Sequence, residues 1–142
     1  MDYKSVKISE DAKIARQSVV IGDVTIGRDS CVLHYAVIRG DDAPIVIGEE
    51  SNVQENCTIH VSRNMPVHIG NNVTVGHNAV LHGCMIGDSL VTKNTVIPDG
   101  SLVMGSPAKI KRNLTWEEQL GNLENSKEYV SVSAEMQKQG VL

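Results

Sequence analysis

A branched aliphatic residue recurs at every sixth position through much of this chain, and this short period limits the possible folds more than any other feature. Starting at Ile14, the series continues with Val20, Ile26, Val32 and Ile38. It resumes after two insertions and ends in shortened steps. A six-residue unit is too short for a pair of helices, but it suits a short strand followed by a bend. We therefore expect the units to wind into stacked coils of parallel strands.

The composition agrees with a core of small aliphatic side chains in layers of equal width, and it argues against nucleic-acid and membrane partners. Hydrophobic residues make up 41% of the 142 residues, yet the chain has no Phe and one Trp. The net charge is −4 and the basic residues cluster only in residues 109–112, so we expect no nucleic-acid partner. No apolar run could cross a bilayer and the N-terminus has no signal-peptide core, so we expect no membrane association. The three cysteines form no C-x-x-C pair, which favours the reducing cytoplasm.

The repeating unit, aliphatic-Gly-x-x-small-x, resembles the hexapeptide repeat of left-handed parallel β-helices from about residue 10 to residue 108. In those proteins three units form one triangular coil, so the resemblance implies an all-β prism of about five coils with three faces. Each face then takes every third aliphatic residue of the series. Face one carries Ile14, Val32, Val53, Val75 and Val91; face two carries Val20, Ile38, Ile59, Leu81 and Ile97; face three carries Ile26, Ile47, Ile69, Ile86 and Val103.

We expect the β-helix domain to occupy residues 1–108, with insertions at residues 40–44 and 62–66 on the corner between faces two and three. Residues 109–142 are expected to form a C-terminal α-helical segment that packs on the prism as a clasp. The helix should begin at a capping box, residues 115–118, and break near residues 125–126. Its apolar stripe is Leu120, Leu123, Val130 and Ala134, and the single Trp116 is expected to pack against the coils.

Two histidines are expected to stack on one face of the prism. His60 and His82 each follow an inward-facing residue of face two, and they are separated by one coil plus a short insertion. Their backbones should therefore be roughly 4.8 Å apart on adjacent strands, which allows both rings to bind one metal ion. His77 lies on face one beyond a corner, where a neighbouring copy could bring it to the same ion. His34 and His68 are interpreted as surface residues.

Further motifs narrow the resemblance. The segments 39–41, 52–56 and 76–84, together with His60, resemble the motif series of γ-class carbonic anhydrases. In that family a homotrimer binds zinc, or another divalent metal such as iron or cobalt, between its subunits. The resemblance implies that His60 and His82 of one chain and His77 of the next bind the metal.

The same resemblance implies roles for four other residues. Arg39 and Asp41 would form the salt bridge that holds the trimer together, and Gln54, which shares face one with His77, would orient the metal-bound hydroxide. Asp42 would be a second carboxylate near the metal. The implied reaction is the reversible hydration of carbon dioxide to bicarbonate by that hydroxide.

Two departures from the family pattern predict weak or absent activity. The insertion at residues 62–66 lacks the carboxylate that exports protons in efficient members. After Asp88 the chain continues directly into residues 89–94, where the family has at least one more coil. Two other functions therefore stay open. One is an acyltransferase that uses acyl-coenzyme A with His34 or His77 as general base, and the other is a non-catalytic trimeric scaffold.

Overall fold

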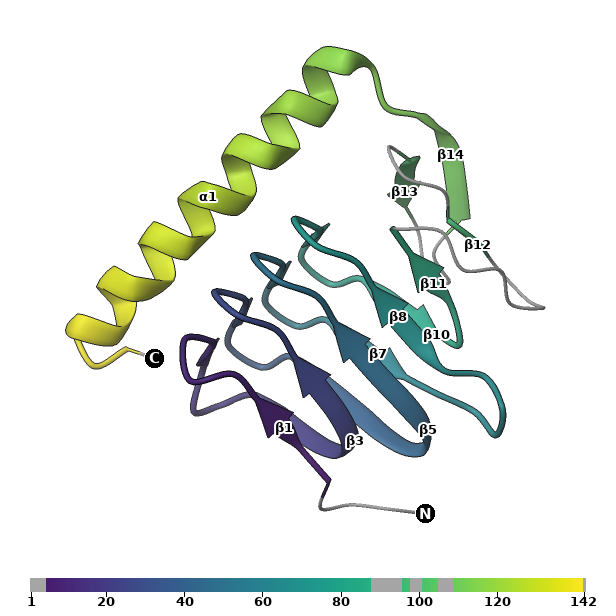
Figure 1. The fold of residues 1–142 in the computed structure, drawn as a ribbon, viewed down its shortest axis with the longest axis horizontal. Coiled ribbons are helices and arrows are strands. Elements are labelled where there is room, and N and C mark those ends of the chain that lie inside the picture. Colours follow the sequence, from purple (N-terminus) through teal and green to yellow (C-terminus); the bar gives the residue numbers. More distant parts are fainter. Residues whose placement is uncertain (1–4, 88–95, 98–100, 105–108, 142) are drawn as a thin grey trace.

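The computed structural model of the chain describes residues 5–87, 96–97, 101–104 and 109–141. Parallel strands wind into a β-solenoid of about four turns, and a long C-terminal helix follows (Figure 1). The predicted left-handed parallel β-helix is therefore confirmed, although it has about four coils where the repeat predicts five. The first strands are β1 (Lys7–Ile8), β2 (Lys13–Ile14), β3 (Val19–Ile26), β4 (Cys31–Val32), β5 (Val37–Ile47), β6 (Asn52–Val53) and β7 (Thr58–His60). The later elements are β8 (Val67–Ile69), β9 (Thr74–Val75), β10 (Val80–His82), β11 (Met85–Ile86), β12 (Val96–Ile97), β13 (Ser101–Met104), β14 (Lys109–Asn113) and α1 (Trp116–Lys138).

The strand register follows the three predicted faces as far as β11. On face two, Val20 pairs with Ile38, Ile38 with Ile59, and Ile59 with Leu81. The corresponding ladder of face one is β2-β4-β6-β9, and that of face three includes β3, β5, β8 and β11. Strands β3 and β5 each run across a corner and so belong to two faces. Most of the stacked Ile and Val side chains are almost completely buried and form the core of the prism, and Ile14, Val20 and Ile86 pack against that core partly buried.

The assignment of faces fails after Ile86. Ile97 was expected on face two, but it pairs with Ile86 on face three. Eleven positions separate Ile97 from Ile86, fewer than the eighteen of a full coil, so the count by sixes no longer gives the face. Val103 was expected on face three of a parallel coil, but it pairs with Ile110 in the antiparallel β13–β14 ladder. Val91 and the departure after Asp88 lie outside the described residues.

Both insertions lie on the corner between faces two and three, as predicted. Residues 40–44 remain inside β5, where the pairing with β3 is irregular between Gly22 and Val24. Residues 62–66 form a tight turn in which Ser62 and Met65 make an isolated antiparallel bridge. The corner therefore carries one bulged strand and one short turn.

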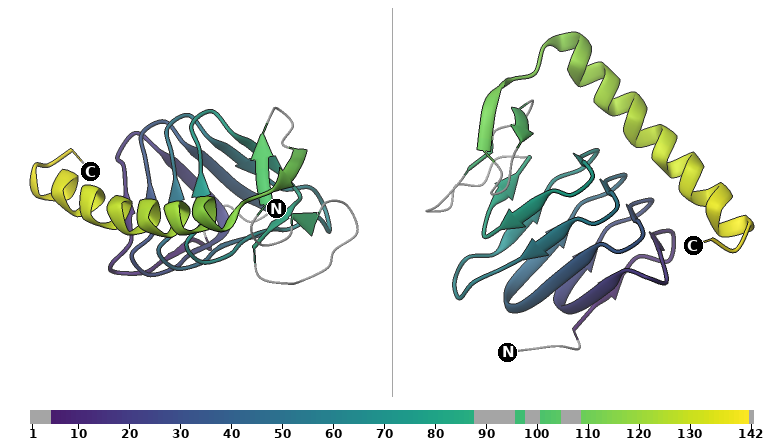
Figure 2. Two further views of the ribbon diagram at one scale, coloured as in Figure 1. Left: turned by 90° about the horizontal axis from the view of Figure 1, so that it is seen from above. Right: turned by 180° about the vertical axis from the view of Figure 1, so that it is seen from behind.

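The C-terminal helix α1 is continuous, so the predicted break near residues 125–126 is wrong. It begins at the predicted capping box, in which the Thr115 hydroxyl accepts from the Glu118 N–H and the Glu118 carboxylate accepts from the Thr115 N–H. Figure 2 shows α1 lying along one side of the prism, and it contacts β2, β4 and β9 of face one. Residues 109–113 were expected to belong to the helical segment, but they form β14.

The side of α1 that faces the prism differs from the predicted stripe. Its buried residues are Ser126 and Ser133. Leu120 and Leu123 are exposed, and the Trp116 side chain is 69% exposed, so the expected packing of Trp116 on the coils is wrong. The first turn of α1 lies near β14, at the opposite end of the helix from the C-terminus of the chain (Figure 1). No helix in the described part of the chain has the length and apolar character of a membrane span.

All three cysteines are free and buried. Burial raises the pKa of the Cys31 and Cys84 thiols to about 11, and burial likewise raises the pKa of Cys57. A thiol with such a pKa is protonated at neutral pH and is a poor nucleophile and metal ligand. The cysteines therefore act as small apolar side chains of the core.

One corner residue has an unfavourable backbone conformation. Tyr35 has a φ of 62° and is 64% exposed, whereas the equivalent corners of the next two coils carry Asn56 and Asn78 at nearly the same φ. Left-handed backbone costs an ordinary L-residue roughly 1–2 kcal/mol, and Asn tolerates it better. We expect Tyr35→Asn to raise the free energy of unfolding by about 1 kcal/mol, measured by urea denaturation. Tyr35→Phe, which keeps the strain, should leave it unchanged. A less stable Asn variant would mean that the tyrosine ring makes contacts worth more than the strain.

Candidate metal centre

Three neighbouring strands present a column of polar side chains beside face two. Arg39 of β5 pairs with His60 of β7, and His60 pairs with His82 of β10. Each follows the inward-facing aliphatic residue of its strand, so the three side chains lie one above the other on the outside of the prism. The imidazole rings of His60 and His82 have centroids 5.1 Å apart. The chain therefore places these two histidines side by side, as their spacing predicts.

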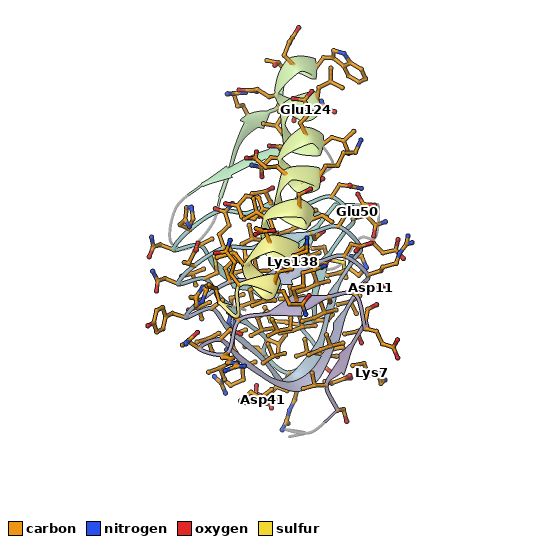
Figure 3. All side chains as sticks on the ribbon, turned by 90° about the vertical axis from the view of Figure 1, so that its left-hand side faces the viewer. Lys7, Asp11, Asp41, Glu50, Glu124 and Lys138 are labelled. Carbon is orange, nitrogen blue, oxygen red and sulfur yellow. The ribbon has the colours of Figure 1, made fainter. Side chains whose placement is uncertain are left out.

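The Asp41 carboxylate joins this column from β5. The side chain is 1% exposed, its Oδ2 accepts a hydrogen bond from the Arg39 guanidinium, and its Oδ1 lies 3.1 Å from His60 Nε2. Burial alone would raise the pKa of the Asp41 carboxyl, but hydrogen bonds from His60, the backbone and Arg39 outweigh it and lower that pKa. The carboxylate is therefore charged at neutral pH and orients the His60 ring. In Figure 3, Asp41 lies at the lower edge of the prism, well away from Glu124 of α1.

The second histidine of the pair has a different partner. Ser62 Oγ, from the turn at residues 62–65, lies 2.9 Å from His82 Nε2. His82 is exposed and Ser62 is partly buried. The repeat predicts the corner on which this turn lies, but nothing in its sequence indicates Ser62 as a neighbour of the site.

His77 lies on the side of the prism that α1 covers. Its Nδ1 is 2.8 Å from Glu55 Oε2, and its side chain is 57% exposed. Its backbone N–H donates to Gln54 Oε1 at 3.2 Å, so Gln54 and His77 do share a face. Gln54 itself is only 6% exposed. Nothing in the repeat indicated Glu55, because its contact depends on how the side chain bends around the corner.

A chain of hydrogen bonds connects His77 to α1. Because the His77 N–H can only donate, Gln54 must accept with its oxygen, and its Nε2 then donates to Asn52 Oδ1 at 3.2 Å. Asn52 Nδ2 donates to Thr74 Oγ1 at 3.0 Å, and the Thr74 hydroxyl donates to Asn125 Oδ1 at 2.9 Å. Asn125 belongs to α1. The helix, which was predicted to act as a clasp alone, is therefore linked to His77 through hydrogen bonds.

A cavity of about 270 Å³ lies between α1 and the prism beside Glu55. It is lined by Leu33, Glu55, Asn125, Glu128, Tyr129, Val132 and Met136. Burial raises the pKa of the Tyr129 hydroxyl, the negative charge of Glu55 raises it further, and a hydrogen bond with Gln54 opposes the change. Tyr129 is therefore a neutral neighbour of Gln54 at neutral pH.

The donor chemistry of the histidine pair fits a divalent metal. Imidazole nitrogens suit zinc, iron and cobalt, and catalytic zinc sites commonly use three protein ligands. Among the residues that the structure describes, no three His, Cys, Asp or Glu side chains lie close enough together to hold one ion. Within one chain the pair of His60 and His82 is therefore incomplete, and His77 is bound to Glu55 on another side of the prism.

The remaining candidate residues lie outside this column. Asp42 follows Asp41 in β5 and its side chain is exposed. His34 Nε2 lies 3.2 Å from the carbonyl oxygen of Val141 near the end of the chain. His68 is partly buried in β8 on face three. Strand register places none of these three side chains beside His60 and His82.

The chain is similar to proteins named carbonic anhydrases and, among solved structures, to a hexapeptide transferase family protein. No family model matches the chain. It is 40% identical to the "Probable carbonic anhydrase" of Methanocaldococcus jannaschii, over 89% of this chain and 95% of that protein. It is 35% identical to the mitochondrial gamma carbonic anhydrase 2 of Arabidopsis thaliana, over 92% of this chain but 58% of the plant protein.

Among solved structures, the fold matches a hexapeptide transferase family protein from Anaplasma phagocytophilum. The TM-score is 0.76 at 30% sequence identity, and the match covers 91% of both chains. This match supports the assignment of the chain's solenoid to the hexapeptide-repeat fold.

Proposed function

Because the chain belongs to the gamma carbonic anhydrase family, we propose that it catalyses the reversible hydration of carbon dioxide to bicarbonate at a metal centre shared between copies of the chain. The observation that carries this proposal is the pair of imidazoles, His60 and His82, on adjacent strands with ring centroids 5.1 Å apart. The buried Asp41 carboxylate behind His60 supports it, because histidine ligands of metals usually have such a partner.

The proposed centre uses His60 and His82 of one copy and His77 of a neighbouring copy in a homotrimer. Two separate observations support this division. His60 and His82 share one ladder, and His77 lies on another side of the prism with its side chain exposed. A bound zinc ion would lower the pKa of a coordinated water to about 7 and so supply hydroxide at neutral pH.

The other residues of the chain have supporting roles in this proposal. Asp41 fixes the orientation of the His60 ring, and Arg39 holds the Asp41 carboxylate in place from the other side. The salt bridge between Arg39 and Asp41 forms within one chain, and in the trimer we assign the half-exposed Arg39 side chain, held by Asp41, to the contact between subunits. Gln54 is held by the His77 N–H in one orientation, so it would present a fixed amide to the reacting carbon dioxide. Asp42, exposed beside Asp41, would be a carboxylate at the edge of the centre.

The proposal is tested by measuring metal content, mass in solution and carbon dioxide hydration on the same purified protein. We expect a trimer with about one divalent ion per chain and a measurable hydration rate that a chelator removes. A metal-free monomer would contradict the central assignment. A trimer that binds metal and gives no hydration would leave the scaffold function in place of the enzyme.

A second candidate function is acyl transfer from acyl-coenzyme A. It is favoured by the match to a hexapeptide transferase family protein at 30% identity over most of both chains. In this case His34 or His77 would act as general base. Binding of acetyl-coenzyme A to the metal-stripped protein would support acyl transfer. A carbon dioxide hydration rate that disappears when the metal is removed would support hydration.

A further inference from the structure

The two histidines of the proposed centre are held by chemically different partners. The His60 ring is next to the buried Asp41 carboxylate on β5, a strand that pairs with β3, β7 and β8. The His82 ring is next to the Ser62 hydroxyl, which is neutral and belongs to the turn at residues 62–65. A hydroxyl can both donate and accept, so it can hold the imidazole in either neutral tautomer. The orientation of His82 therefore depends on how firmly the turn fixes Ser62.

The turn is built to fix that serine. The Met65 N–H donates to the Ser62 carbonyl oxygen at 2.8 Å, and Asn64 has a φ of 61°, as a type II turn requires at its third residue. Met65 of this turn also packs against Gly83, the residue after His82. A Cβ built on Gly83 would lie 2.8 Å from Met65 Cε and 3.0 Å from Met65 Cβ. The absence of a side chain at Gly83 thus lets Met65 pack directly over the end of β10.

We propose that Ser62 is the positioning residue of His82, and that the turn at residues 62–65 thereby controls how tightly the centre retains its metal. This inference rests on the proposed function, because it assigns His82 as a ligand. Metal ligands whose rings are hydrogen-bonded by a second residue lose about 10- to 100-fold in metal affinity when that residue is removed. The insertion that lacks a proton-exporting carboxylate consequently has a different task, which is to hold a ligand.

The first experiment measures metal affinity. Cobalt-loaded wild type, Ser62→Ala, Ser62→Thr and Arg63→Ala proteins are titrated with a chelator, and the visible absorption of the cobalt ion reports its geometry. We expect Ser62→Ala to weaken affinity about 10-fold or more and to alter the spectrum. Ser62→Thr keeps the hydroxyl and should remain within about threefold of wild type. Arg63→Ala changes an exposed side chain of the same turn and should resemble wild type.

Two results of this titration would overturn the inference. One is a Ser62→Ala protein that retains cobalt as tightly as wild type. The other is a Ser62→Thr or Arg63→Ala protein that is as weak as Ser62→Ala, since the hydroxyl would then not be the cause. Circular dichroism of each variant checks that the solenoid is folded.

A second readout separates this inference from the proposed function. In the metal-stripped full-length protein, nuclear magnetic resonance of the His82 ring nitrogens should show a shift on Ser62→Ala and little change on Arg63→Ala. If wild type binds no cobalt but the His82 signals shift on Ser62→Ala, the metal function is wrong and the positioning contact is real. If cobalt binds and the His82 signals are the same in both proteins, Ser62 has no positioning role.

Discussion

Replacing His82 with alanine is expected to release the metal and to reduce carbon dioxide hydration to the uncatalysed rate. The variant removes one of the two imidazoles that share a ladder in the chain. Removal of a residue that only supports a ligand costs about 10- to 100-fold in metal affinity, so removal of the ligand itself should cost more than about 100-fold. Metal content per chain, measured by elemental analysis after gel filtration, should fall from about one to near zero, and the hydration rate should fall with it.

His34→Ala is the matched control for this experiment. His34 is a histidine outside the column whose Nε2 contacts the Val141 carbonyl oxygen. The variant should keep its metal and its hydration rate. Because His82 is exposed, His82→Ala should change the free energy of unfolding by no more than about 0.5 kcal/mol. A His82→Ala protein that keeps one ion per chain would refute the assignment, and a His34→Ala protein that loses its metal would show that the effect is not specific to the histidine column.

Replacing Gly22 with alanine is expected to destabilise the solenoid strongly. Gly22 of β3 has a φ of 92°, and a Cβ at this position would lie 2.3 Å from the carbonyl oxygen of Gly40 in β5. Backbone atoms cannot move aside as the end of a side chain can, so β3 and β5 would have to separate. We expect a loss of about 3 to 5 kcal/mol in the free energy of unfolding, measured by urea denaturation. Such a loss is a large part of the stability of a small domain.

Gly121→Ala provides the control in the same chain. Gly121 lies in α1, and a Cβ there would meet no atom within 4 Å. Alanine is the better helix former, so this variant should be more stable by up to about 1 kcal/mol. Opposite signs for the two Gly→Ala changes are therefore expected. A Gly22→Ala protein as stable as wild type would mean that β3 and β5 are not packed as closely as the structure shows.

The repeat predicted the fold well where its period was intact and failed where it was not. The faces of Val20, Ile38 and Ile59 follow from counting, because a six-residue unit brings each aliphatic residue back to a fixed place in the coil. Ile97 and Trp116 were misplaced for a common reason. Their positions depend on how the chain leaves the prism, and the period carries no information about that.

The repeat also predicted the part of the candidate site that depends on strand register, and it missed the rest. The stacking of His60 on His82 depends on backbone register alone and could be counted. The partners of these rings could not be counted, because Asp41 and Ser62 come from the two insertions that interrupt the repeat. Asn125 was missed because its contact joins residues far apart in the sequence.

The hydrogen bonds between His77 and α1 have a single polarity. Because the first member is a backbone N–H, the donor and acceptor ends of Gln54 and Asn52 are decided in turn, and the Thr74 hydroxyl then donates to the side chain of Asn125. Neither Gln54 nor Asn52 can turn over alone without placing two donors or two acceptors face to face in this partly buried row. A helix that meets the prism at few points is thereby held to one rotational setting, and the C-terminal segment and the His77 loop must keep or lose their order together.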